Sequence, residues 1–273
     1  MTRSLHPLSW FASCTLIAVA STLVAPSASA QGFSAVVSPP RFESTAKAGT
    51  TYRDVIEISN VSTQPSPLTV KTADWHLDAS DAAVFTDDLA TDSCRPWVAI
   101  ERKELTLGAN GKYRFRFEVT VPPATADREC RFALMFEGAS QQVDAQGLKL
   151  PVSGRIGVVV YLAVGNVASD LQLKGYGSQS VNERKLPSLR IANRGTAHGR
   201  LDGFVEGTDA DGGTWTLVPS TLPILPGEER DVALSFDEGN NGKKKSEPHY
   251  PLKLHGTVYD GHREIVVDTS FSP

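Results

Sequence analysis

The sequence predicts an all-β protein made of two β-sandwich domains that follow a cleaved signal peptide. Short segments alternate apolar and polar residues with a period of two, as in residues 113–119 (YRFRFEV) and 263–267 (REIVV), whereas helical periodicity is nearly absent. Turn pairs such as Asn110 with Gly111 separate these segments at intervals of roughly 8 to 12 residues, which is typical of antiparallel sandwiches. A length of 273 residues is enough for two domains that each bury a core of their own.

Residues 1–30 have the pattern of a secretory signal peptide. Arg3 gives a basic start, residues 10–25 form an apolar stretch, and Ala28-Ser29-Ala30 offers the small residues that signal peptidase accepts. A membrane anchor is the alternative, but the apolar stretch is shorter than the roughly 20 residues that a bilayer needs. A lipoprotein is disfavoured because Cys14 lies inside the apolar stretch rather than after it. We therefore expect an exported chain whose mature form has no membrane segment.

Removal of the signal peptide leaves two cysteines, Cys94 and Cys130, in an exported protein. An even pair in an oxidising compartment is most simply a disulfide. A metal site would need further ligands nearby, and a catalytic thiol would need a partner histidine. We therefore predict a disulfide between these two residues.

The mature chain is predicted to divide into a first domain over residues 31–165 and a second over residues 166–273. The division falls at a short polar segment, residues 166–170 (NVASD), which follows the most apolar segment of the mature chain, residues 155–162 (RIGVVVYL). Such an apolar run predicts a strand covered on both faces, or one that crosses between sheets. Strand-like segments after the division predict a second sandwich: residues 171–173, 188–193, 215–217 and 232–236.

The sequence carries no motif for catalysis or nucleic-acid binding. A Gly-x-Ser-x-Gly elbow, a Walker loop and a dinucleotide-binding fingerprint are all absent. The net charge of −4 gives no basic field that would attract nucleic acid. The lysines within residues 240–247 (NNGKKKSE) are expected to be a solvated loop.

Three histidines near the C-terminus, His249, His255 and His262, do not predict a zinc site. A two-residue hairpin turn at residues 260–261 would pair Tyr259 with His262. His255 would then lie several residues down the ladder, away from His262. We expect no metal to be held there.

Asp209 opens a segment (DADGG) that begins like a calcium loop. The bidentate glutamate expected at the twelfth position of such a loop is Ser220 here, so the segment is predicted to be a hairpin turn. The scattered Trp75, Trp97 and Trp215 are expected in sandwich cores rather than on a sugar-binding platform. Together these patterns predict a protein that is not an enzyme and that needs no cofactor or metal.

A series of short motifs runs in order through the first domain. The motifs are Ser38-Pro39-Pro40-Arg41-Phe42-Glu43, Ala48-Gly49, Ile58-Ser59-Asn60, Pro67, Trp75, Phe85, Pro96-Trp97-Val98, Leu105-Thr106-Leu107-Gly108, Val121-Pro122, residues 128–134 and residues 155–161. Their order and spacing resemble the periplasmic pilus-assembly chaperones of the PapD-like superfamily. The resemblance implies an immunoglobulin-like fold for the first domain and a periplasmic location. The second domain matches only as a further immunoglobulin-like sandwich.

The resemblance implies that the protein binds pilin-like subunits by strand donation. A subunit served by that family lacks one strand of its own sandwich, and the chaperone lends its last first-domain strand to the open edge. Leu148, Leu150 and Val152 alternate as a donor strand requires, with Lys149 and Pro151 on the other face. Pro151 has no N–H to donate, which suits an edge position. Ordinary core alternation is the other interpretation of the three apolar residues.

The family also holds the subunit's C-terminal carboxylate between two basic residues. Arg41 lies where the first is expected, and a guanidinium can bind a carboxylate through charge-assisted, bidentate hydrogen bonds. The position that aligns with the second, a lysine in the family, is Gly157 or Val158. Arg155 is the nearest base, and on a strand it shares a face with Gly157. The resemblance therefore assigns Arg41 and Arg155 to carboxylate binding, with an ordinary surface arginine as the alternative for Arg41.

Three features depart from the family pattern and favour a divergent branch. The last strand ends in Tyr161-Leu162-Ala163 rather than Tyr-Arg-Pro, residues 137–147 are short for the donor-strand loop, and the pair Cys94 and Cys130 is unusual. The resemblance implies secreted pilin-like subunits as partners, with an outer-membrane usher. The main alternative is a secreted structural or adhesive immunoglobulin-like protein of a surface assembly, and a hydrolase is the least favoured.

Overall fold

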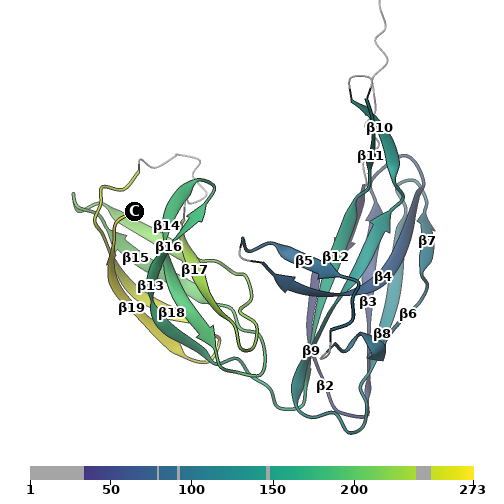
Figure 1. Ribbon diagram of the computed structural model, residues 1–273, viewed down its shortest axis with the longest axis horizontal. Coiled ribbons are helices and arrows are strands. Elements are labelled where there is room, and N and C mark those ends of the chain that lie inside the picture. The colour runs from purple at the N-terminus through teal and green to yellow at the C-terminus, as the bar shows by residue number, and fades with distance from the viewer. Residues whose placement is uncertain (1–33, 79, 91–92, 146–147, 238–246) are drawn as a thin grey trace, which may run out of the picture. The chain divides into compact units, whose positions relative to one another are not determined.

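A computed structural model describes residues 34–78, 80–90, 93–145, 148–237 and 247–273 (Figure 1). The predicted signal peptide, residues 1–30, lies outside this part of the chain. Apart from one short 3₁₀ helix, η1 (Arg95–Trp97), the regular elements of the described residues are strands, which confirms the all-β class. None of the described residues form a helix long and apolar enough to cross a membrane.

The strands up to residue 164 form the first sandwich and a hairpin that extends from it. They are β1 (Ala35–Ser38), β2 (Arg41–Ala46), β3 (Thr51–Asn60), β4 (Ser66–Leu77), β5 (Ala83–Thr86), β6 (Val98–Ile100), β7 (Glu104–Leu107), β8 (Lys112–Thr120), β9 (Arg128–Gly138), β10 (Gln141–Ala145), β11 (Leu148–Val152) and β12 (Arg155–Val164). One sheet has the order β1-β3-β8-β6, and the other has the order β2-β12-β9-β4-β5 with β7 also paired to β4. Pro39 and Pro40 lack N–H groups, so they interrupt the ladder where the chain passes from β1 in one sheet to β2 in the other.

The core of the first sandwich lies between these two sheets. Phe115, Phe132 and Phe136 are fully buried there, with Phe115 and Phe136 in an edge-to-face contact at 5.4 Å between ring centroids. Burial of one such side chain contributes roughly 1.5–3 kcal/mol to folding. The alternation seen in residues 113–119 therefore places one set of side chains in this core and leaves the other at the surface.

β12 is covered on both faces, which is one of the two arrangements predicted for residues 155–162. Val158, Val160 and Leu162 belong to the core between the sheets. Val159 and Tyr161 point to the opposite face and pack in a second apolar cluster. The outer face of this sheet is thus partly apolar, unlike an ordinary solvated face.

The second sandwich begins after β12 ends at Val164. Its strands are β13 (Leu171–Val181), β14 (Arg184–Asn193), β15 (Asp202–Thr208), β16 (Thr214–Pro219), β17 (Glu229–Phe236), β18 (Leu252–Tyr259) and β19 (Glu264–Phe271). They are hydrogen-bonded in the order β13-β14-β17-β16-β15-β18-β19 and enclose a separate core that includes Leu189, Ile191 and Leu217. Two β-sandwich domains are therefore present, and the boundary between residues 165 and 166 stays a prediction.

Two predicted turns of the second sandwich have different outcomes. Asp209 accepts hydrogen bonds from the backbone N–H groups of Asp211 and Gly213 in the β15–β16 hairpin, so the DADGG segment is a turn as predicted. The prediction of a two-residue turn at residues 260–261 is wrong. Tyr259 pairs with Glu264 rather than with His262, because Asp260 accepts the N–H groups of residues 262 and 263 and closes a four-residue loop.

Candidate functional site

The two arginines assigned to carboxylate binding lie in the β2-β12-β9-β4-β5 sheet. The parallel register of β2 and β12 places Arg41 opposite Val159, whereas Arg155 lies opposite Glu137 of β9. Arg155 and Val159 are four residues apart on β12, so they share a face but are separated by roughly 13 Å. Arg41 and Arg155 are both exposed, on one face of the sheet but at different levels along it.

Neither residue that aligns with the family's lysine can supply a base on this face. Val158 points into the core and is fully buried. At Gly157 the ring of Phe85 from β5 and the sulfur of Met135 fill the space in front of the strand: a Cβ would lie 2.6 Å from the Phe85 Cζ and 3.1 Å from the Met135 Sδ. A longer side chain at Gly157 would have to displace the Phe85 ring, which covers the position where the family has its lysine.

The guanidinium of Arg41 is already paired within its own strand. Its Nε lies 2.8 Å from Oε1 of Glu43, two residues further along β2. Nη1 of Arg200, in the segment that precedes β15, lies 2.7 Å from the same oxygen. Two arginines thus hold one oxygen of one carboxylate, and charge-assisted bonds of this kind are among the stronger ones in proteins. Arg200, and not Arg155, is the second base beside Arg41.

Arg200 is also held in place by a chain of contacts through His198. Its Nη1 also lies 2.7 Å from Nε2 of His198, whose Nδ1 is 2.6 Å from Oε2 of Glu129. Because a guanidinium can only donate, Nε2 of His198 must accept, so we assign the ring proton to Nδ1, which donates to Glu129. The His198 ring stacks on Tyr161 of β12 at 3.8 Å between centroids. This chain of contacts fixes the guanidinium at the edge of the sheet.

Tyr161 offers a pH-dependent test of this packing. Burial raises its pKa from 10.0 to about 12, with Arg200 acting in the opposite direction. A folded-state pKa above the unfolded value means that this contribution to stability is complete below pH 10 and is lost as the pH rises toward 12. We expect Tyr161→Phe to reduce the fall in unfolding free energy between these pH values, as measured by urea titration. Tyr52, whose pKa is also raised to about 12, is present in both proteins and contributes equally to the fall in each. The difference between the two proteins therefore reports Tyr161, and an equal fall in both would contradict the assignment.

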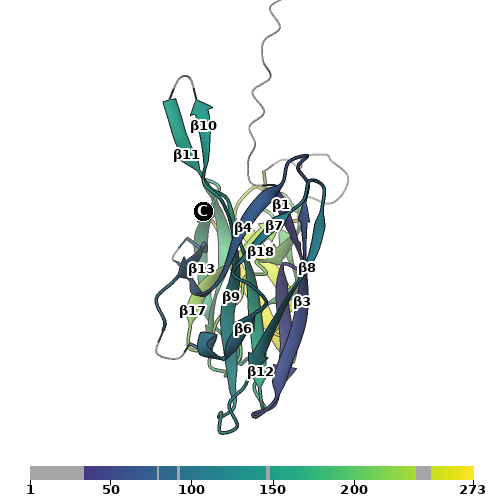
Figure 2. The same ribbon diagram turned by 90° about the vertical axis from the view of Figure 1, so that its right-hand side faces the viewer.

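The predicted donor strand is β11, one half of a hairpin with β10. Its backbone register pairs residue 150 with residue 143 and residue 148 with residue 145. The hairpin continues β9 and β12 beyond the sandwich, as Figures 1 and 2 show, and the Gly138 N–H donates to the Gly154 carbonyl at its base. In the described part of the chain β11 pairs only with β10, so its other edge has no strand beside it. Leu148, Leu150 and Val152 occupy alternate positions of β11, and their side chains lie outside the description.

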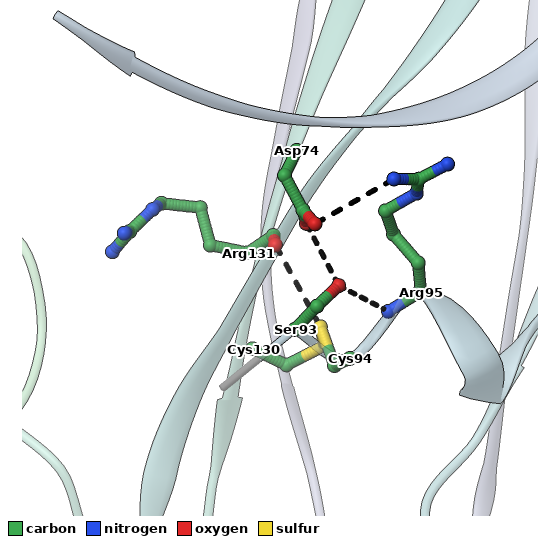
Figure 3. Close-up of a disulfide and its surroundings, with 6 residues drawn as sticks. All are labelled: Asp74, Ser93, Cys94, Arg95, Cys130 and Arg131. Carbon is green, nitrogen blue, oxygen red and sulfur yellow. Dashed lines mark hydrogen bonds and ion pairs between the residues drawn. A yellow bond between two sulfur atoms is a disulfide. The ribbon is translucent and has the colours of Figure 1, made fainter. Parts of the chain in front are cut away.

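The structure contains the disulfide between Cys94 and Cys130, whose Cα atoms are 5.7 Å apart (Figure 3). Cys94 precedes η1 and Cys130 lies on β9, so the bond joins the β5–β6 connection to the centre of the sheet. Beside it, Ser93 donates to Asp74 at 2.8 Å, and Arg95 lies 3.6 Å from the same carboxylate and donates to the Thr72 carbonyl. Ser93 and Arg95 thereby hold the β5–β6 connection against β4.

The described residues contain no group of three or more histidine, cysteine or acidic side chains that could hold a metal. His255 faces Asp268 across β18 and β19, and His249 pairs with Asp211. Of the tryptophans, Trp215 lies in the second core and Trp97 packs against the first, while Trp75 belongs to the cluster on the outer face of the sheet.

The sequence did not reveal the group around Glu43. His198 and Arg200 lie more than 150 residues from Glu43, and no local spacing links them to it. In the sequence, Glu129 belongs to the motif at residues 128–134, which gives no sign of a contact with His198. The position of Arg41 two residues before Glu43 on one strand is the single local signal, since such residues share a face.

No protein-family model and no curated protein sequence matches this chain. Solved structures with a similar fold include the YadV chaperone, at 12% identity and a TM-score of 0.46, with 88% of this chain and 100% of that chain covered. The CupB2 chaperone of Pseudomonas aeruginosa has 13% identity and a TM-score of 0.43, with coverage of 87% and 100%. A chain from the Salmonella enterica SafA pilin in complex with the SafB chaperone has 14% identity and a TM-score of 0.43, with coverage of 88% and 97%.

Proposed function

We propose that this chain is a periplasmic chaperone that binds pilin-like subunits by donating β11 to their open sheet and passes them to an outer-membrane usher. It holds the subunit's C-terminal carboxylate at Arg41. It catalyses no reaction and uses no cofactor or metal. The sequence resemblance names this class of protein, and the unpaired edge of β11 supports strand donation.

The observation that carries the proposal is that, among the described residues, β11 pairs only with β10 and leaves its other edge open. A hairpin of two short strands is marginally stable in water, and a third strand is normally needed for stable pairing. β11 is the strand that leads directly into β12, where Val158, Val160 and Leu162 anchor it to the core. A partner strand beside β11 would therefore be held in register by a rigid element. Backbone hydrogen bonds would supply much of the affinity, and alternate side chains would fill the subunit's core.

The proposal predicts that Arg41→Ala weakens the capture of partners. Loss of a charge-assisted bond to a carboxylate costs about 1.5–3 kcal/mol, or roughly tenfold or more in affinity. The measurement is co-purification from periplasm, followed by native mass spectrometry of the one-to-one complex. Arg53→Ala is a matched control, since Arg53 lies on the other sheet and pairs with Glu118. Equal capture by Arg41→Ala and wild type would refute the anchor, and self-assembly without a subunit would favour a structural or adhesive protein instead.

A further inference from the structure

The carboxylate of Glu43 lies between the guanidinium groups of Arg41 and Arg200. Its Oε1 lies between Nε of Arg41 at 2.8 Å and Nη1 of Arg200 at 2.7 Å. Arg41 and Glu43 are about half exposed, with side-chain exposures of 54% and 42%, whereas Arg200 is mostly buried at 17%. A carboxylate from solution can therefore reach the same two guanidinium groups if Glu43 turns away.

Glu43 does not fully satisfy the two arginines. Both use the same oxygen of Glu43, and Nε of Arg200 is buried without an acceptor in the described part of the chain. A ligand carboxylate can give one oxygen to each guanidinium, which is the geometry that arginine binds best. After exchange each guanidinium would still be paired with a carboxylate oxygen, so neither arginine would lose its charged partner.

We propose that Arg41 and Arg200 form a carboxylate clamp and that Glu43 is its internal competitor, displaced when a polypeptide C-terminus binds. The identity of this ligand rests on the proposed function, while the clamp rests on the contacts of Arg41, Glu43 and Arg200. Glu43 pairs with both arginines and holds them in place in the free protein. Glu43 also lowers the affinity of the two arginines for any carboxylate ligand, and it favours ligands that make further contacts with the protein.

The test uses a probe too short to pair as a strand, so its outcome is independent of strand donation. The probe is N-acetyl-alanyl-phenylalanine with a free carboxylate, compared with its C-terminal amide, titrated against the mature chain labelled with ¹⁵N-arginine. We expect the acid alone to shift the side-chain signals of Arg41 and Arg200. Glu43→Gln, which keeps the shape and removes the charge, should bind the acid several-fold to about tenfold more tightly.

Arg200→Gln and Arg41→Gln should each lose the preference for the acid over the amide, whereas Arg155→Gln should keep it. A gain of affinity in Glu43→Gln cannot arise from misfolding, so this variant decides the case even if Arg200→Gln is unstable. The inference is overturned if the acid shifts neither arginine in Glu43→Gln, or if Arg155→Gln alone removes the preference. If the acid binds as expected but periplasmic capture does not depend on β11, the clamp stands and the proposed function fails.

Discussion

Replacement of both Leu148 and Leu150 by aspartate is expected to abolish the capture of subunits. Each leucine would lose roughly 1.5–3 kcal/mol of burial in the partner's core, so affinity should fall by at least about a hundredfold. The buried carboxylates would add a further cost because nothing in an apolar groove pairs with them. The measurement is the yield of the one-to-one complex after co-expression in the periplasm.

The matched control lies on the same strand. Lys149→Asp changes charge by more than either leucine substitution but occupies the alternate position of β11. We expect it to retain capture, with both variants folding as wild type by circular dichroism. Equal loss in Lys149→Asp and in the leucine variant would indicate a general effect of acidic charge and would contradict strand donation.

Loss of the disulfide is expected to have the largest effect on stability. Cys94 and Cys130 are fully buried in the first core and are separated by 36 residues in sequence. In the chain-entropy model, closure of a loop of this length stabilises the fold by about 3–4 kcal/mol. Cys94→Ser combined with Cys130→Ser should lower the unfolding free energy by at least this amount, because two hydroxyl groups would also be buried.

Urea unfolding of the oxidised wild type, the reduced wild type and the double variant separates these contributions. Reduction alone should account for most of the loss, and Cα–Cα proximity of 5.7 Å means that re-oxidation should restore it. A loss below about 1 kcal/mol on reduction would show that the loop is constrained by other contacts, such as those of Asp74 and Arg95, rather than by the disulfide.

Much of the fold follows from periodicity that is local in sequence. Residues 113–119 alternate strictly and become β8, and the continuous apolar run from residue 155 becomes β12, which is covered on both faces. The cysteine pair could also be predicted, because an exported chain with two cysteines leaves one simple pairing. In each case the physical cause, a half-buried pleat, a doubly covered strand or an oxidising compartment, leaves its mark within a short segment or in the composition.

The site could be predicted only in part, because its partners are set by register and by distant segments. The sequence predicts Arg41, and proximity to Gly157 points to Arg155 as its companion. The register of β12 instead places Arg155 roughly 13 Å from the level of Arg41. Gly157 stands where the family has its lysine, and the Phe85 ring covers it. This contact depends on how β5 pairs with β4, which the local sequence does not show. Arg200 comes from a segment that no pattern joins to Arg41. The turn after Tyr259 was missed for a similar reason, since side-chain bonds from Asp260 lengthen the loop.

Hydrogen–deuterium exchange of β11 tests the central claim most directly. The backbone N–H groups on the unpaired edge of β11 should exchange quickly in the free protein and become strongly protected in the purified complex with a captured subunit. The protection should be confined to β11 and its flanks, with the exchange of β18 and β19 in the second sandwich unchanged. A stable complex in which β11 exchanges as fast as in the free protein would contradict donation of this strand.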